Sequence, residues 1–279
     1  TDAQTATPND GKAFFGRDAM ANYMLIGAKQ LGCTLFEVKD GKMILDFDKE
    51  VVRRLWDSYY VPFVKGWFAA SGRFRSDDIK TGNILTYTGS TSSATFFPTQ
   101  VMADDNISYD IEMKVLPSPV FEGGEAYAVQ QGAGMVVTRG IEEEEAASME
   151  FLKWFTELEN NIAFSVGAGY LPVTVEANDM AKIKKNTKLT SSMEEILSEG
   201  VETVTNNTLY TSPAFKGGAD ARSILEYAMS DQAAEDRKAV LGKLEKGISE
   251  EEAEAEFLSD AHFESWYETT LKKLQALEG

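Results

Sequence analysis

A run of small hydroxyl side chains is the first feature of this sequence that could do chemistry. Residues 89–95 (GSTSSAT) place five hydroxyls and a glycine directly after a predicted strand. Hydroxyls donate and accept hydrogen bonds, and a helix starting here would offer its free N–H groups to a phosphate or to clustered sugar hydroxyls. An ordinary helix N-cap with spare serines is the alternative. The segment lacks the lysine of a P-loop, so nucleotide hydrolysis is not implied.

Two glycine-containing segments could also meet a ligand. Residues 131–134 (QGAG) lack the third glycine of a dinucleotide fingerprint, but they suit a strand start where a ligand passes close to the backbone. Residues 167–173 (GAGYLPV) predict a stiff, exposed turn that presents the ring of Tyr170. An aromatic face can stack on a sugar, and the tyrosine hydroxyl can bind a polar group. The alternative is that Tyr170 packs against the core.

A fourth candidate is Arg222, which follows an irregular loop over residues 210–218 and stands at the start of a predicted helix. Its guanidinium could hold a phosphate or a carboxylate through two parallel hydrogen bonds, or a diol less tightly. Arg222 lies two residues after Asp220, so a surface ion pair is the alternative.

The scarcity of cysteine and histidine argues against most enzyme classes. Cys33 is the only cysteine and His262 the only histidine. They allow no internal disulfide and cannot supply the about four ligands of a structural zinc site. A histidine-based triad would need His262, which a surface position on an acidic terminal helix explains more simply. We therefore predict a protein that is not an enzyme, with no catalytic residues, metal or cofactor.

The carboxylates keep one enzymatic alternative open. With 45 acidic residues in the chain, a pair at the separation needed for glycoside hydrolysis cannot be selected from sequence. A secreted carbohydrate-active hydrolase that uses a carboxylate pair is therefore the alternative function.

Composition limits the partners. The 279 residues carry a net charge of −18, which repels nucleic-acid phosphates and anionic lipid headgroups. No run approaches the about 20 apolar residues of a membrane span. Hydrophobic residues make up 43% of the chain, enough for a globular core. We expect neither nucleic-acid binding nor a membrane span in this chain.

The candidate residues must be positioned by alternating helices and strands. The patterns predict a helix over residues 14–31, a short strand over 83–88, a longer strand over 107–116 and a buried strand over 134–138. Turn and cap signals predict a turn at Asp40-Gly41, a helix from Asp48 to Val61-Pro62, a helix opened by the acidic run 142–145, capping boxes at Ser191 and Ser249, and mostly helix from Met193 onward. The predicted fold class is α/β.

Taken in order, several of these segments resemble the family 1 extracellular solute-binding proteins of ABC importers, with the glycerol-3-phosphate and oligosaccharide-binding type as the nearest group. The matching segments are residues 16–23 (GRDAMANY), 46–48 (DFD), 80–84 (KTGNI), 89–92 (GSTS), 132–137 (GAGMVV), 150–156 (EFLKWFT) and 169–174 (GYLPVT). Each segment is weak by itself, whereas the ordered set with similar spacings is fairly specific.

The resemblance implies a periplasmic-binding-protein-like type II architecture with two α/β lobes and a ligand cleft between them. On this mapping, residues 10–118 and 173–279 form the second lobe with the C-terminal helices. Residues 121–172 cross back to complete the first lobe. The family pattern has a signal peptide and a whole first lobe before the region that matches Gly16. We therefore expect this chain to lack most of its N-terminal lobe.

The resemblance also implies a function and a set of contacts. It implies an extracytoplasmic protein, either periplasmic or a cell-surface lipoprotein, that passes a sugar or polyol phosphate to an ABC permease. The ligand-binding positions are Ser90, Thr91, Ser92, Gly132, Ala133, Tyr170, Arg222 and Arg17. The chain departs from the glycerol-3-phosphate branch around residues 12–18, where Lys12, Phe14, Phe15 and Arg17 replace tryptophans, so the substrate can differ.

Overall fold

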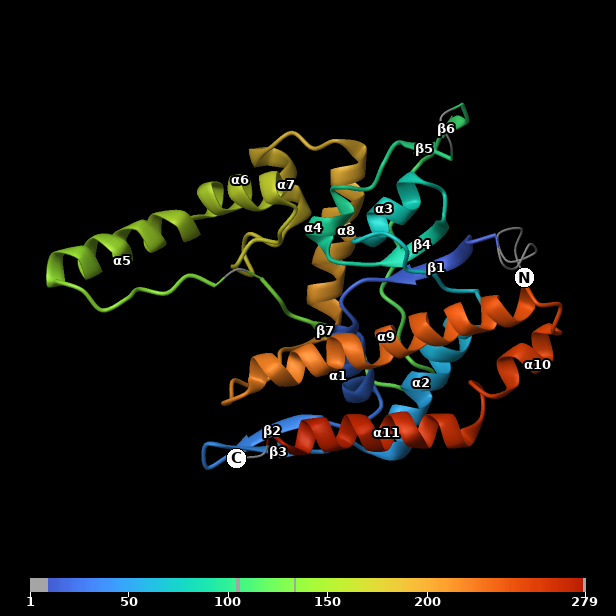
Figure 1. Ribbon diagram of the computed structural model, residues 1–279. Coiled ribbons are helices and arrows are strands. Elements are labelled where there is room, and N and C mark those ends of the chain that lie inside the picture. Colours follow the sequence, from blue (N-terminus) through green and yellow to red (C-terminus); the bar gives the residue numbers. More distant parts are fainter. Residues whose placement is uncertain (1–9, 104–105, 133, 278–279) are drawn as a thin grey trace.

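The computed structural model describes residues 10–103, 106–132 and 134–277, which form a mixed α/β protein (Figure 1). Within these residues the strands pair two by two, β1–β4 and β7–β8 in parallel and β2–β3 and β5–β6 antiparallel. The strands are β1 (Ala13–Arg17), β2 (Phe36–Lys39), β3 (Lys42–Leu45), β4 (Ile84–Thr88), β5 (Gln100–Met102), β6 (Ser108–Asp110), β7 (Tyr127–Val129) and β8 (Thr208–Tyr210). The helices are α1 (Met20–Gln30), α2 (Lys49–Val64), α3 (Arg75–Lys80), α4 (Thr91–Ala94), α5 (Glu142–Thr156), α6 (Leu158–Ala168), α7 (Met180–Asn186), α8 (Ser191–Asn206), α9 (Gly218–Leu244), α10 (Glu250–Ala255) and α11 (Asp260–Gln275).

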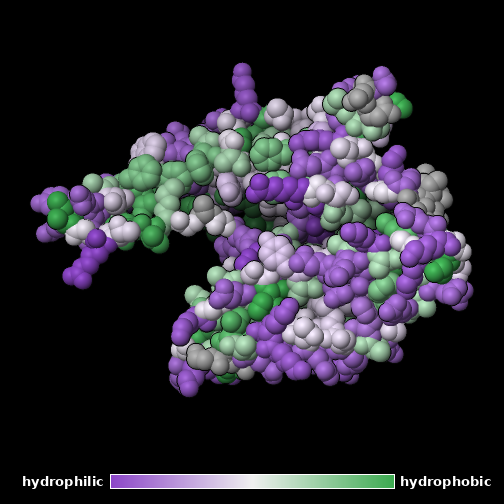
Figure 2. Space-filling model, in the orientation of Figure 1, coloured by the Kyte–Doolittle hydropathy of each residue, from purple (hydrophilic) through white to green (hydrophobic). Residues whose placement is uncertain are grey.

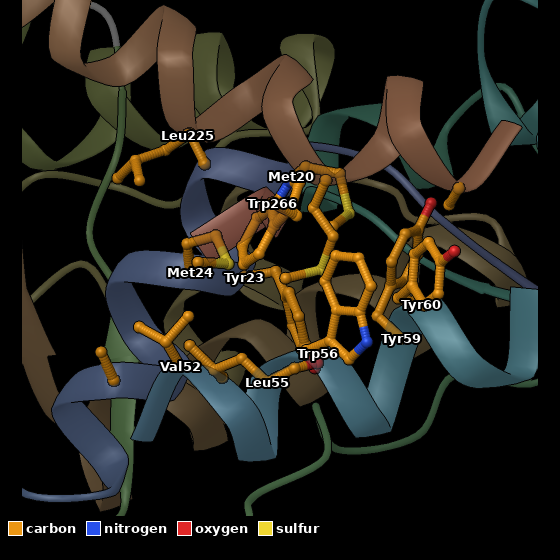
Figure 3. Packing of buried hydrophobic residues seen from close by; sticks show 14 of the residues in the cluster. Met20, Tyr23, Met24, Val52, Leu55, Trp56, Tyr59, Tyr60, Leu225 and Trp266 are labelled. Atoms are coloured by element: carbon orange, nitrogen blue, oxygen red, sulfur yellow. The ribbon is translucent and has the colours of Figure 1, made fainter. Parts of the chain in front are cut away.

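The main hydrophobic core lies among α1, α2, α9 and α11 (Figure 3). Trp56 of α2 is fully buried, stacks on Tyr60 with ring centroids 3.6 Å apart and meets Trp266 of α11 at 4.6 Å. Burial of such large aromatic side chains dominates core energetics. The core therefore fixes α9, which carries Arg222, and α1, which follows the strand that carries Arg17.

The parallel pair β1–β4 replaces part of a predicted helix. The apolar spacing over residues 14–31 predicts one helix, but the chain forms β1 first and enters α1 only at Met20. Ala19 separates the two elements in a left-handed conformation, with φ of 56°. The prediction was wrong at its start because pairing with β4, about 70 residues away, satisfies the backbone of residues 13–17 and overrides a local preference.

Several local signals are confirmed. Asp40 and Gly41 adopt φ of 51° and 75° and join β2 to β3, which is the geometry of a tight hairpin turn. Asp48 caps α2 by accepting a hydrogen bond from the Val51 N–H. Ser249 caps α10, and the acidic run opens α5. The strand predicted over residues 83–88 is β4.

Three element boundaries differ from the predictions. α2 continues through Pro62 to Val64, because Phe63 and Val64 extend its buried face. Thr190, not Ser191, caps α8 by accepting a hydrogen bond from the Met193 N–H. The strand predicted over 107–116 shortens to β6, because only three of its residues find partners in β5.

Residues 134–156 form an arm, defined as the extended segment 134–141 followed by α5, which projects from the body (Figure 1). The predicted buried strand over 134–138 is wrong. Val136 is 85% exposed, and within the described residues no strand pairs with this segment. α5 buries none of its side chains. Figure 2 shows apolar surface along the arm. Soluble proteins rarely leave so many large apolar side chains exposed together.

Candidate ligand-binding site

The carboxyl ends of β1 and β4 meet at one edge of their small sheet. Arg17 and Thr88 are register partners, and the Asp18 N–H donates to the Thr88 carbonyl at 3.0 Å. α1 follows β1 and the hydroxyl segment follows β4, so both connections leave from this edge. In open α/β structures, ligands bind outside the carboxyl ends of parallel strands.

The hydroxyl segment forms both a cap and a cluster. Ser90 is the N-cap of α4, and its Oγ accepts from the Ser93 N–H at 3.1 Å. The same Oγ lies 3.0 Å from the Oγ of Ser92. The N-cap interpretation therefore holds for Ser90. Thr91 and Ser92 follow it in the first turn and remain partly exposed.

The Tyr170 turn packs directly against α4. Gly169 ends α6 with φ of 69°, and a Cβ there would lie 3.0 Å from the Ser92 Cα and 2.5 Å from the Thr95 Cγ2. Tyr170 is 37% exposed, so its side chain is not part of the core. The structure thus brings Gly169, the residue before Tyr170, against Ser92, from which it is separated by 77 positions in the sequence.

Arg222 joins three separate segments through side-chain amides. Its Nη2 donates to the Oδ1 of Asn22 in α1 at 2.9 Å. The Nδ2 of Asn22 donates to the Oε1 of Gln131 at 2.8 Å. The surface ion pair with Asp220 does not form among the described residues. Arg222 therefore links α9, α1 and the chain that leaves β7.

The glycine-lined segment next to Gln131 is only partly described. Gly132 is exposed and is not in a strand, so the predicted strand start is not formed there. Ala133, the other residue predicted in this segment, lies outside the described residues. Gly132 nevertheless follows Gln131 directly and so neighbours the Asn22–Arg222 chain.

Glu226, one turn after Arg222 on α9, caps α1 from outside. Its Oε1 accepts from the Met20 N–H at 3.1 Å and its Oε2 from the Ala21 N–H at 2.8 Å. α1 has no cap of its own, because Ala19 has no polar side chain. A carboxylate at the positive end of a helix is favourable. Sequence reasoning missed this contact, and the absence of an N-cap residue before α1 was its only signal.

Asp18 belongs to a buried ion-pair network beneath the same edge. Arg75 is buried, pairs with Asp78 at 2.5 Å and approaches Asp18 at 3.4 Å. Burial raises the pKa of the Asp18 carboxyl, although its hydrogen bonds and charge contact with Arg75 act in the opposite direction. This network fixes the start of α3 against β1.

Arg17 lies above aromatic rings. Its guanidinium carbon is 4.5 Å from the ring centroid of Tyr23 and 5.6 Å from that of Phe15. Burial lowers the pKa of the Arg17 guanidinium from its ordinary value. Arg17 is thus held at the carboxyl end of β1, at the sheet edge that also leads to the hydroxyl segment.

The single histidine takes part in a different cluster. The Nε2 of His262 lies 2.8 Å from the Oδ2 of Asp236, and the Tyr60 hydroxyl donates to the same oxygen at 2.5 Å. The prediction that His262 lies on the surface is wrong, because α11 packs its side chain partly buried beside Trp56. Its partners lie in the helical body rather than in the hydroxyl segment.

The hydroxyl segment and Arg17 share one sheet edge, and the turn before Tyr170 packs against the hydroxyl segment. Such polar and aromatic groups suit a protein that binds a polar small molecule. A comparison with protein families identifies the class of binding protein: residues 1–191, about two thirds of the chain, match the bacterial extracellular solute-binding proteins. The chain belongs to this family. Among the curated proteins, no match was found.

Membership of the family defines the role in general terms. The chain has a substrate-binding role for a transporter, its ligand is a small molecule, and its place of action is extracellular. Proteins of this kind are generally not enzymes. Among the helices of the described residues, none has both the length and the apolar character required to span a bilayer.

Proposed function

We propose that this chain captures a sugar or a polyol phosphate in an interlobe cleft and delivers it to the permease of an ABC importer. The convergence of Ser90, Ser92 and Tyr170 beside the carboxyl ends of β1 and β4 carries the proposal. Hydroxyls and a tyrosine ring suit a polyhydroxylated ligand, because the ring stacks on its apolar face while the hydroxyls bond its oxygens. Arg222 then supplies a charge for a phosphate.

The hydrolase alternative gains no support from Asp78 and Asp236, two of the three buried carboxylates among the described residues. Asp78 is held by Arg75, and Asp236 is held by Tyr60, Gln232 and His262. Neither stands ready as a general acid or nucleophile. A binding mechanism, in which closure around the ligand presents it to the permease, requires no such group.

We further propose a type II division in which residues 10–118 and 173–279 form the second lobe and residues 121–172 contribute to the first. The arm supports this division. The arm has exposed apolar side chains, and its extended segment has no partner strand among the described residues. A β–α unit has these features when no neighbouring strand packs beside it. On this proposal the protein acts in the periplasm or as a cell-surface lipoprotein.

Calorimetric titration of the protein with both lobes present tests the function. The panel contains glycerol-3-phosphate and a set of malto- and xylo-oligosaccharides. We expect micromolar or tighter binding to one class and no turnover. Cleavage of a sugar would replace the proposal with the hydrolase, whereas heat absent from every titration would reject this ligand class.

Replacing Arg222 with Ala tests the site. For an anionic ligand we expect affinity to fall by about 2 kcal/mol or more, because a charge-assisted bond is lost. Lys238→Ala removes the same charge from an exposed position on the same helix and should leave affinity unchanged. Equal affinities of the two variants would remove Arg222 from the site.

A further inference from the structure

The guanidinium of Arg17 is a cation without a counterion among the residues that the structure describes. It is partly buried against the rings of Tyr23 and Phe15, and it makes no hydrogen bond or ion pair with any residue in the described part of the chain. Arg75 shows how this protein treats a structural arginine: two aspartates and two backbone carbonyls surround it. Arg17 is only partly buried, and it lacks such partners among the described residues.

Two carboxylates of neighbouring segments, Asp18 and Glu226, are already engaged. Asp18, the next residue in the chain, directs its Oδ1 to the backbone N–H and the Nε of Arg75. Glu226 is held by the N–H groups of Met20 and Ala21. Both acids are therefore committed to positioning helices, and neither neutralises Arg17.

A second unsatisfied group lies beside Arg17. The Oγ1 of Thr88 is buried and has no hydrogen-bond partner in the described structure. Arg17 and Thr88 are register partners in adjacent parallel strands, so their side chains leave the same face of the sheet. A cationic donor and an orphaned hydroxyl thus sit side by side at the carboxyl end of the strand pair.

Two unsatisfied polar groups at one place require a physical reason. A partly buried charge without a partner and a buried hydroxyl without a bond are both costly, and folded proteins nearly always pair them. Such a cost persists where the missing acceptor comes from a ligand. A carboxylate or phosphate oxygen would bond to the guanidinium in its preferred planar geometry and accept from the hydroxyl at the same time.

We propose that Arg17 and Thr88 form an anion subsite, and that the solute bound by this protein carries a carboxylate or a phosphate. This inference rests on the proposed function and narrows its ligand from any polar sugar or polyol to an anionic one. The lowered pKa of Arg17 reflects the same desolvation that the bound anion would relieve.

Thermal unfolding of the 279-residue chain in different anions tests the subsite without a known solute. Phosphate, acetate and chloride are compared at equal ionic strength. At about ten times its Kd, a bound anion should raise Tm by about 3 °C or more. We expect this rise for the wild-type chain in phosphate or acetate relative to chloride, and the responding anion identifies the ligand group.

Three variants separate the subsite from charge in general. Arg17→Gln should abolish the anion-specific rise, and Thr88→Val should reduce it at least threefold. Arg73→Gln is the control, because Arg73 is exposed and lies over the ring of Phe74, 5.3 Å from its centroid; it should keep the full rise. In chloride, Arg17→Gln and Thr88→Val should unfold at or above the wild-type Tm, since each removes an unsatisfied group.

Two results of the unfolding experiment would overturn the inference. One is a wild-type Tm that does not distinguish phosphate and acetate from chloride. The other is an equal rise in Arg17→Gln and wild type. The proposed function can fail while the subsite holds. If the anion raises Tm but the sugar and glycerol-3-phosphate titrations show no binding, the subsite stands and the solute is another anion. A neutral oligosaccharide bound equally by wild type and Arg17→Gln would sustain the function and reject the subsite.

Discussion

At the scale of single residues, three arginines differ in the partners of their guanidinium groups, and this difference separates a structural role from a ligand-binding one. Arg75 is buried, pairs with Asp18 and Asp78 and donates to the Ala69 and Gly72 carbonyls, so its role is structural. Within the described residues, Arg222 has a single neutral partner, the amide of Asn22, which a ligand anion can supplement. In the same part of the chain, Arg17 has aromatic contacts only. Because a guanidinium is always charged, the number of acceptors around it indicates what remains for a ligand.

Cys33 provides a prediction at the same scale. Its side chain is 4% exposed, its thiol donates to the Asp46 carbonyl at 3.2 Å, and burial raises the pKa of the thiol to about 11. Only about one thiol in a thousand is then ionised near pH 8, and the thiolate is the reactive form. We expect a thiol reagent to label the native chain at least about 100-fold more slowly than the chain in concentrated guanidinium.

Because Cys33 is the only cysteine, the measured rate refers to one site. Raising the pH toward 11 should increase the native rate, since the thiolate fraction rises. Native and denatured rates within about tenfold of each other near pH 8 would contradict the buried, protonated thiol.

At the scale of elements, the site depends on how α4 meets the turn after α6. α4 is a single turn held by the Ser90 cap, and Gly169 lets the Tyr170 turn approach it closely. A residue with a side chain would be strained there by its φ of 69° and would collide with Ser92 and Thr95. The conformational freedom of one glycine thus places the tyrosine beside the hydroxyls.

Gly169→Ala should therefore destabilise the fold by about 2 kcal/mol or more, through strain and overpacking, and lower Tm by about 4 °C or more. Gly167→Ala is the matched control. Gly167 is helical, exposed and has open space around its Cα, so an added methyl should be neutral or stabilising by up to about 1 kcal/mol. Unfolding monitored by circular dichroism compares the variants, and equal stabilities would refute the close approach.

At the scale of the whole molecule, a well-packed helical body carries an arm that buries little. The exposed apolar side chains of the arm and the helix after it are Met135, Val136, Ile141, Met149, Phe151, Trp154 and Phe164. A groove of about 540 Å³ lies between the extended segment and α5. Contiguous apolar surface of this kind promotes association.

The arm should make this chain self-associate. We expect sedimentation velocity to show an average mass that rises with concentration, and the double substitution Phe151→Ser with Trp154→Ser to suppress that rise. Tyr227→Ser is the control, because Tyr227 on α9 is 57% exposed, close to the 52% of Trp154, but lies outside the arm. A concentration-independent monomer mass for the wild-type chain would contradict this role of the arm.

The sequence alone determined the elements whose signals are local: the Asp40-Gly41 turn, the Asp48 and Ser249 caps, the acidic start of α5 and the α/β class. These depend on backbone conformation and on bonds within a few residues, which neighbouring residue types dictate. The ordered motifs also led to the solute-binding family, which the match over residues 1–191 shows.

The tertiary structure alone decided the contacts between distant segments. Only pairing with β4 makes residues 13–17 a strand, and only the absence of a neighbouring strand among the described residues leaves 134–138 exposed. The same holds for the site: Glu226 caps α1, Asn22 holds Arg222, and Thr88 lies beside Arg17. Such contacts join residues that lie far apart in the sequence. Residue types and local spacing predict a segment's own conformation, but they do not say which distant segment will pack against it.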